Sequence, residues 1–138
     1  VYGPAESSDT VTLYEVKKQY SVNKKTGTVS LGSAIAGRIC RVTNPFGGVC
    51  PAGLAGELLI GGVGLMKEYV GSPELTQRVL VRPPGESDLF YRTGDRVMLG
   101  ADGELHFLGR VDFQLKLRGQ RLEPGDLAGG MELAQQAP

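Results

Sequence analysis

Two short stretches carry residue types that could bind a charged or polar ligand. "YRTGD" covers Tyr91–Asp95, and "GRVDFQLKLRG" covers Gly109–Gly119. Each stretch joins a tight glycine turn to acidic and basic side chains. Asp95 offers a carboxylate that only accepts hydrogen bonds, and Arg110 offers a permanently charged guanidinium. Taken alone, Asp95 could equally be a turn residue after Gly94, and Arg110 a solvated strand end.

A third stretch lies at the start of the sequence. "YGPAE" at Tyr2–Glu6 places an aromatic ring, a Gly-Pro turn and a carboxylate within five residues. Such a turn can present a ring face to a base and a carboxylate to a hard cation. A surface turn without a ligand is the alternative. The glycine-rich bend in "GELLIGGVGLMKEYVGSPELT" lacks the residue order of a Walker phosphate loop.

Composition excludes several classes of protein. The 138 residues include 41% hydrophobic and 22% charged residues, which is typical of a single globular domain. Fifteen basic and fifteen acidic residues cancel, so no basic field predicts nucleic acid or anionic lipid as a partner. The apolar runs are too short to cross a membrane, and no signal peptide is expected. The expected location is cytoplasmic.

The cysteines and the histidine give little support for a metal site. Cys40 and Cys50 lack a CxxC spacing, so we expect two reduced thiols, with a disulfide as the alternative. His106 is the one histidine in the sequence, which argues against a zinc site or a histidine-dependent triad. Its alternation with Leu105 and Phe107 predicts a solvent-facing strand position.

Twenty-one glycines and eight prolines favour short strands joined by turns. The predicted strands are Gly37–Val42, Gly56–Ile60, Leu89–Tyr91, Val97–Leu99, Glu104–Leu108 and Gln114–Leu117. "ADGE" at Ala101–Glu104 predicts a hairpin.

The helical and loop predictions are fewer. In "SPELTQRVL", Ser72 can cap a helix that begins at Pro73. The pattern at Thr10–Lys18 is compatible with a strand or a helix. Exposed loops are expected at Val22–Gly27 and Arg82–Asp88.

The four motifs occur in a recognisable order. "YGPAE", "GELLIGGVGLMKEYVGSPELT", "YRTGD" and "GELHFLGRVDFQLKLRGQRLEPGDL" together resemble the adenylate-forming (AMP-binding) superfamily. The sequence is most similar to the amino-acid-activating adenylation domains of nonribosomal peptide synthetases, from Val1 to about Leu127. The resemblance implies a mainly β fold with short helices (α+β), a distorted β-barrel-like subdomain of an adenylate-forming enzyme.

The same resemblance implies a division of the chain. Residues 1–112 would be the end of the large adenylation domain. Residues 113–127 would be the strands that follow the hinge, at the start of the small C-terminal domain. Residues 128–138 are expected to be a disordered tail.

The resemblance also assigns roles to particular residues. The residue matching Tyr2 lies against adenine, and the residue matching Phe107 lies near the base. The residue matching Asp95 accepts hydrogen bonds from the ribose hydroxyls, which suits an acceptor-only carboxylate, and the residue matching Arg110 reaches the ribose and phosphate side. The residue matching Glu6 helps to hold Mg²⁺.

Further roles follow for the substrate pocket and the hinge. The positions matching Val1, Asp9 and Thr10 help to line the amino-acid pocket. Asp112 matches the hinge between the large and small domains, and Lys116 lies on the strand that follows it. None of these residues is implied to be catalytic in this segment.

The activity implied is that of a ligase in secondary metabolite biosynthesis. It uses ATP and Mg²⁺ to convert an amino acid to an aminoacyl-AMP. The acyl group then passes to the phosphopantetheine thiol of a peptidyl carrier protein. The 138 residues lack the family's phosphate loop and its catalytic lysine, and Ala5 replaces a usual threonine. We therefore expect the isolated chain to be inactive. A fragment of an acyl-CoA ligase and a non-catalytic truncated binding module are the alternatives.

Overall fold

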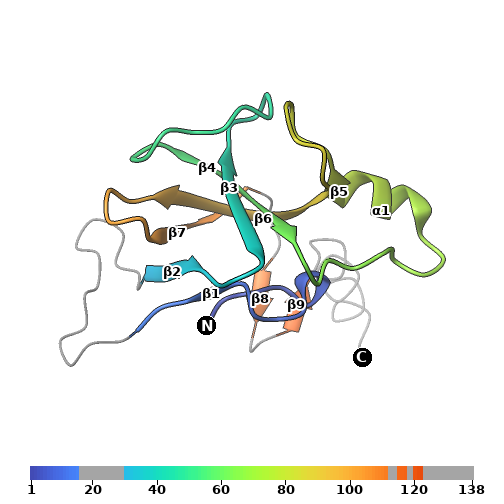
Figure 1. Ribbon diagram of the computed structural model, residues 1–138. Helices are drawn as coiled ribbons and strands as arrows, with labels where there is room; N and C mark the ends of the chain where they lie inside the picture. The colour runs from blue at the N-terminus through green and yellow to red at the C-terminus, as the bar shows by residue number, and fades with distance from the viewer. Residues whose placement is uncertain (16–29, 112–114, 118–119, 123–138) are drawn as a thin grey trace, which may run out of the picture.

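The structure is a computed structural model that describes residues 1–15, 30–111, 115–117 and 120–122 (Figure 1). Its main element is a curled antiparallel sheet with the strand order β1-β2-β7-β6-β4-β3, and β5 also pairs with β6. The strands are β1 (Thr12–Leu13), β2 (Ser30–Ala34), β3 (Arg38–Thr43), β4 (Ala55–Gly62), β5 (Leu80–Val81), β6 (Phe90–Leu99) and β7 (Leu105–Arg110). β8 (Leu115–Leu117) and β9 (Gln120–Leu122) form a separate hairpin.

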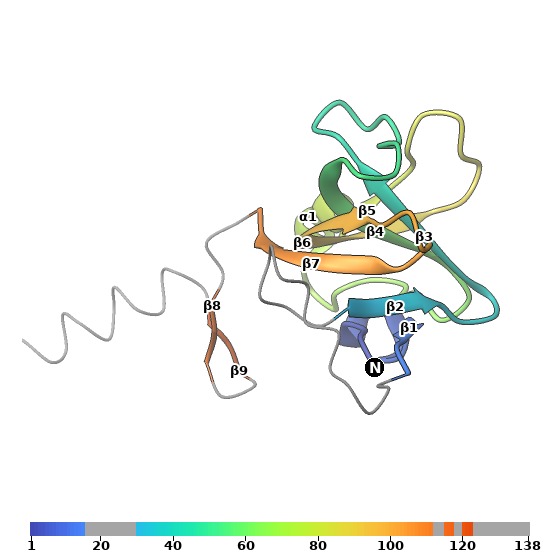
Figure 2. The same cartoon turned by 90° about the vertical axis from the view of Figure 1, so that its left-hand side faces the viewer.

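Two helices accompany the sheet in the described residues. They are the 3-10 helix η1 (Ala5–Ser7) and the α-helix α1 (Pro73–Val79). Both are short, so the fold is mainly β, which confirms the predicted fold class. Figure 2 shows the long neighbouring strands β6 and β7 above β2 and β1, with the N-terminal segment beside β1. None of the helices in the described part of the chain is long and apolar enough to span a membrane.

The core lies inside the curl of the sheet. Its buried cluster consists of Val11, Val42, Leu58, Ile60, Val97 and Leu105. β4 is an interior strand of the sheet, and Leu58, Leu59 and Ile60 are all buried. Successive side chains of a strand point to opposite faces, so both faces of β4 are covered here. A continuous apolar run is what a strand covered on both faces requires.

Most of the strand predictions are confirmed, with one correction. We predicted separate strands at Leu89–Tyr91 and Val97–Leu99 with a turn at "YRTGD", but β6 is one strand of ten residues. Gly94 has a φ of 69°, which a glycine adopts without strain, and the pairing of β6 with β4 shifts register there. The glycine therefore makes a bulge inside a strand, not the end of one.

The other local predictions have mixed outcomes. The "ADGE" hairpin connects β6 to β7, where the Gly100 nitrogen donates to the Glu104 oxygen at 2.8 Å. Ser72 occupies the N-cap of α1 with Pro73 as the first helical residue, but the Ser72 side chain makes no capping bond. The Thr76 hydroxyl ties the preceding segment to the helix, accepting from the Tyr69 nitrogen at 2.9 Å and donating to the Ser72 oxygen at 3.0 Å.

The remaining predictions are resolved in part. The ambiguous stretch at Thr10–Lys18 contains the two-residue strand β1, and Arg82–Asp88 is a largely exposed loop. Cys40 and Cys50 are both free thiols, as expected. The loop at Val22–Gly27, the hinge residue Asp112 and the tail 128–138 lie outside the described residues.

Candidate functional site

The register of β6 and β7 brings the two leading candidate residues together. Asp95 and Arg110 are direct cross-strand partners. The Arg110 Nη1 donates to Asp95 Oδ1 at 2.8 Å, with 13% and 4% of the two side chains exposed. Such an ion pair tolerates burial only because each charge has a bonded partner. Asp95 is therefore not an exposed turn residue, and Arg110 is not a solvated strand end.

The bulge in β6 explains why Asp95 points inward. Arg92 and Arg96 are exposed on either side of it, whereas Thr93, Gly94 and Asp95 are all buried. Three consecutive buried residues break the alternation of a regular strand. The Thr93 hydroxyl supports this geometry by donating to the Leu58 oxygen at 2.8 Å and accepting from the Asp95 nitrogen at 2.9 Å.

Glu57 on β4 completes the support of the bulge. Its Oε1 accepts a hydrogen bond from the Gly94 nitrogen at 3.2 Å, and its Oε2 pairs with Arg92 Nη2 at 2.7 Å. Buried backbone groups require such partners, because an unpaired one costs about 1–3 kcal/mol. The threonine of "YRTGD" and the glutamate of "GELLI" thus work together across two strands.

Tyr2 joins Asp95 from the opposite end of the sequence. Its phenol donates to Asp95 Oδ2 at 2.5 Å, and its backbone forms a bridge to Thr12 beside β1. Burial raises the pKa of the Tyr2 phenol above its ordinary value of 10, and the neighbouring Asp95 carboxylate raises it further. Tyr2, Asp95 and Arg110, called the strand cluster below, therefore hold a phenol, a carboxylate and a guanidinium in one half-buried place.

Glu6 lies in a second arrangement, which is built from loops. The Tyr69 phenol donates to Glu6 Oε1 at 2.5 Å, and the Met66 nitrogen donates to the Glu6 backbone oxygen at 2.8 Å. Burial raises the pKa of Tyr69, and its hydrogen bond to Glu6 adds to that rise. The bonded pair Glu6 and Tyr69 is called the loop contact below.

Further bonds hold the loop contact in place. The Ser8 hydroxyl donates to the Gly64 oxygen at 2.9 Å, and Arg38 donates to the Ser7 and Val63 oxygens. The glycine-rich bend after β4 is therefore a support for η1.

The chemistry of Glu6 fits Mg²⁺ as a single protein ligand. Mg²⁺ prefers oxygen ligands and usually keeps several waters while binding one or two carboxylates and substrate phosphates. A carboxylate has about four acceptor positions, so the hydrogen bond from Tyr69 does not exhaust Glu6. Glu6 is the last residue of "YGPAE" and the middle residue of the 3-10 helix η1, which fixes its backbone.

The remaining predicted site residues are less closely grouped. Phe107 on β7 pairs with Val97 and packs against the core cluster. Val1 is 82% exposed, and Asp9, with a φ of 57°, and Thr10 lie in the loop after η1. Lys116 lies on β8, opposite Arg121 in the hairpin. The roles of these residues stay predictions.

Sequence reasoning missed three supporting residues, Thr93, Glu57 and Tyr69, and misplaced His106. The three supporting residues were quoted only inside their motifs, without a role. The signal for Thr93 was its place before a glycine in a strand, since a hydroxyl can replace a lost backbone partner. The predicted solvent-facing position of His106 is wrong, because only 13% of its side chain is exposed.

Comparisons with known proteins connect this geometry to a group of enzymes. The chain is 35% identical to Gramicidin S synthase 2 from Brevibacillus brevis over 127 residues, which is 91% of this chain and 3% of that protein. It is 38% identical to Surfactin synthase subunit 1 from Bacillus subtilis over 128 residues, which is 92% of this chain and 4% of that protein. No family model matches the sequence.

Solved structures share the fold. An NRPS (nonribosomal peptide synthetase) protein containing adenylation and PCP (peptidyl carrier protein) domains aligns with a TM-score of 0.81 and 30% identity, over 95% of this chain and 26% of that chain. An artificially fused adenylation–PCP di-domain from Klebsiella oxytoca aligns with a TM-score of 0.83 and 29% identity, over 98% of this chain and 24% of that chain. The chain thus spans a small part of the curated relatives and about a quarter of each solved chain.

Proposed function

We propose that the strand cluster binds the ribose of ATP, in a chain that corresponds to the later part of a nonribosomal peptide synthetase adenylation domain. The buried, paired carboxylate of Asp95 is the observation that carries the proposal. It only accepts hydrogen bonds, and a vicinal diol supplies two donors. The partners Tyr2 and Arg110 hold the carboxylate in place before the ligand arrives.

The other groups take roles around the nucleotide. The ring of Tyr2 offers a face to adenine, and Phe107 lies two strand positions before Gly109, near the same end of β7. Arg110 carries a permanent charge toward the ribose and phosphate side. Glu6 is the ligand for Mg²⁺, which neutralises phosphate charge and orients the phosphates when it is bound.

The whole reaction would be that of an amino-acid-activating ligase. The amino-acid carboxylate attacks the α-phosphate of ATP, the bond to the β-phosphate breaks, and aminoacyl-AMP and pyrophosphate form. The thiol of a carrier-protein phosphopantetheine then displaces AMP. The names of the two structural relatives, which include adenylation and PCP domains, support a carrier protein as the partner. The same names favour this class over an acyl-CoA ligase.

The test is Asp95→Asn in a complete adenylation domain that contains these 138 residues. The substitution keeps the size of the side chain but replaces one acceptor oxygen with a donor NH₂ that faces the ribose hydroxyls. Hydrogen bonds to charged groups contribute about 1.5–3 kcal/mol, so the apparent affinity for ATP should fall roughly ten- to a hundredfold.

A matched control separates this effect from a general loss of charge. Glu86→Gln also removes the acid of an arginine pair, since Glu86 Oε1 lies 3.0 Å from Arg41 Nε on the surface. Its ATP affinity should not change. Both variants are compared at a temperature well below their unfolding transitions, because Asp95 is buried. Wild-type ATP affinity in folded Asp95→Asn would refute the proposed role.

A further inference from the structure

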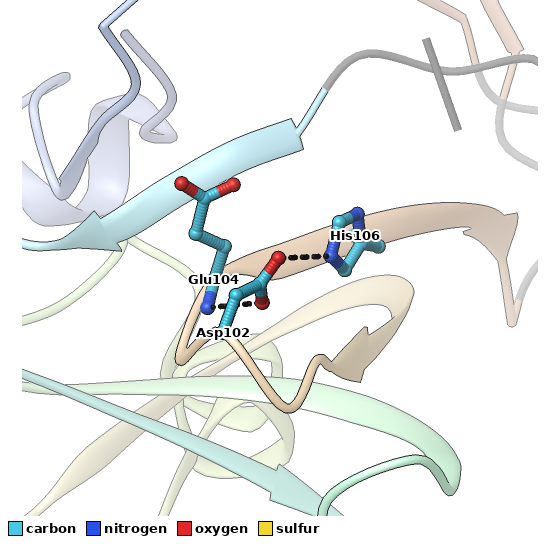
Figure 3. Close-up of side chains that lie close together, drawn as sticks. All are labelled: Asp102, Glu104 and His106. Atoms are coloured by element: carbon cyan, nitrogen blue, oxygen red, sulfur yellow. Dashed lines mark hydrogen bonds and ion pairs between the residues drawn. The ribbon is translucent and has the colours of Figure 1, made fainter. Parts of the chain in front are cut away.

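A group of three potential metal ligands lies on the β6–β7 hairpin, and the proposed function does not use it. Asp102, Glu104 and His106 place one ligand atom each within 4.8 Å of one another. Asp102 lies in the turn, Glu104 is the residue directly before β7, and His106 is the second residue of β7, so the hairpin brings all three close together. Figure 3 shows the Asp102 carboxylate between the backbone of Glu104 and the His106 ring.

We propose that these three residues form a binding site for a divalent transition-metal ion of the zinc type. One imidazole nitrogen and two carboxylate oxygens are ligands that such an ion accepts, with water in the remaining position. The single histidine argued against a zinc site in the sequence analysis, and the geometry of the hairpin leads us to depart from that expectation. A site with one imidazole and two carboxylates needs only His106.

The distances suit coordination better than a direct hydrogen bond. His106 Nε2 lies 3.6 Å from Asp102 Oδ2, which is longer than an ordinary hydrogen bond. Ligands about 2.0–2.2 Å from a tetrahedral zinc ion are roughly 3.4 Å from each other. The two atoms are therefore already close to the separation that a shared ion imposes. The Glu104 side chain has enough rotatable bonds to complete the set.

The hairpin holds two of the ligands in place before any ion binds. Asp102 Oδ1 accepts a hydrogen bond from the Glu104 nitrogen at 3.0 Å, which turns Oδ2 toward His106. Such a bond to a ligating carboxylate orients it for metal binding. Gly100 permits the arrangement, because a Cβ there would lie 2.3 Å from Asp102 Oδ1 and 2.8 Å from His106 Nε2.

The burial of His106 also requires an explanation. Only 13% of its side chain is exposed, and its buried Nδ1 has no hydrogen-bond partner among the described residues. Packing therefore fixes the position of the ring, and Nε2 is the ring nitrogen that faces Asp102. Nε2 is thus held in place for an ion, and Asp102, 56% exposed, leaves a path for the ion to reach it.

The experiment is a Zn²⁺ titration of the 138-residue chain, followed through the imidazole resonances by NMR. The sequence has one histidine, so the imidazole signals belong to His106 alone. Zn²⁺ should shift these signals and saturate at one ion per chain. Loss of a residue that only hydrogen-bonds to a metal ligand typically lowers metal affinity about 10- to 100-fold. Removal of a ligand itself should therefore lower the Zn²⁺ affinity by more than that.

Two variants and a control make the result specific. Asp102→Asn keeps the turn, since asparagine forms the same side-chain bond to the backbone, but it removes the charged ligand. His106→Ala removes the imidazole, and its amide spectrum reports whether the fold is retained. Both should lose the tight binding, whereas Glu74→Gln on the exposed first turn of α1 should bind like the wild type.

Three results would overturn the proposal. The first is Zn²⁺ binding that leaves the imidazole signals unchanged, which would assign the ion to Cys40 or Cys50 instead. The second is an imidazole spectrum that excess Zn²⁺ does not alter. Unchanged affinity in Asp102→Asn would equally exclude the carboxylate as a ligand. None of these outcomes depends on ATP binding, so the test is separate from that of the proposed function.

Discussion

The strand cluster and the loop contact hold similar side chains in different ways. Both bond a phenol to a carboxylate at 2.5 Å. In the strand cluster the carboxylate of Asp95 is 3% exposed and is fixed by the pairing of β6 with β7. In the loop contact Glu6 is half-buried and is held by a bend that follows β4. The first arrangement therefore depends on sheet register, and the second depends on a few loop bonds.

This difference determines what each region contributes to stability. A buried charge that loses its partner retains the full cost of its removal from water. An exposed charge that loses its partner is solvated again at little cost. Residues of the strand cluster should therefore be required for folding as well as for ligand binding. Residues of the loop contact should affect binding with a smaller effect on the fold.

The largest effect is expected from Arg110→Ala. It leaves Asp95 buried without its cation, and breaking such a pair costs about 3–5 kcal/mol of the free energy of unfolding. Urea denaturation of the purified chain measures this loss. The double variant Arg110→Met, Asp95→Leu should recover part of it, because two apolar side chains leave no buried charge. A loss below about 1 kcal/mol in Arg110→Ala would mean that the pair behaves as a surface ion pair.

A direct comparison of the two phenols should give the next largest effect. Tyr2→Phe removes a hydrogen bond to a buried carboxylate, which contributes about 1.5–3 kcal/mol. Tyr69→Phe removes a bond to the more exposed Glu6, and we expect a loss of about 1 kcal/mol or less. Matched urea denaturation of the two variants measures the difference. Equal losses would show that the loop contact is as rigid as the sheet.

Thr93→Val should cost about 1–3 kcal/mol, because it leaves the buried Asp95 nitrogen and Leu58 oxygen without their partner. The side chain keeps its shape, so loss of packing contributes little. Thr43→Val is the matched control on β3, where the buried hydroxyl makes only a long contact of 3.4 Å with the Glu57 oxygen. The same denaturation experiment compares the two. A control that loses as much as Thr93→Val would contradict the specific role of the bulge.

Part of this comparison could be predicted from the sequence. Glycine and proline positions located β3, β4, β6, β7 and β8 but not β2, β5 or β9, and "ADGE" placed a hairpin between Asp95 and Arg110, so the proximity of these two residues follows from local rules. The continuity of β6 could not be predicted, because Gly94 has the appearance of a strand terminator. Its backbone is supported by Glu57, which lies 37 residues earlier in the chain.

The phenol partners could not be predicted for a similar reason. Tyr2 and Asp95 are 93 residues apart, and Glu6 and Tyr69 are 63 residues apart. No local pattern connects residues at such separations. The family resemblance supplied roles for Tyr2, Glu6 and Asp95 but did not state that their side chains bond to supporting residues. Those bonds depend on the order of strands in the folded sheet.

The smallest effect is expected from alkaline pH, and it tests the burial of Tyr2 directly. Burial, with Asp95 next in importance, raises the pKa of this phenol above 10 in the folded protein. The unfolded chain ionises the same phenol with a pKa of about 10. The folded state therefore holds its proton longer, and the stability that this provides is complete below the unfolded pKa and is lost as the pH rises above it. At pH 10, where half of the unfolded phenols are ionised, the loss is about 0.4 kcal/mol.

Urea midpoints measured as the pH rises from neutral to about 10 should fall less in Tyr2→Phe than in the wild type. Tyr69→Phe should reduce this fall less than Tyr2→Phe does, because solvent screens the loop contact. An identical pH dependence in Tyr2→Phe and the wild type would mean that Tyr2 ionises freely and does not bond to a buried carboxylate.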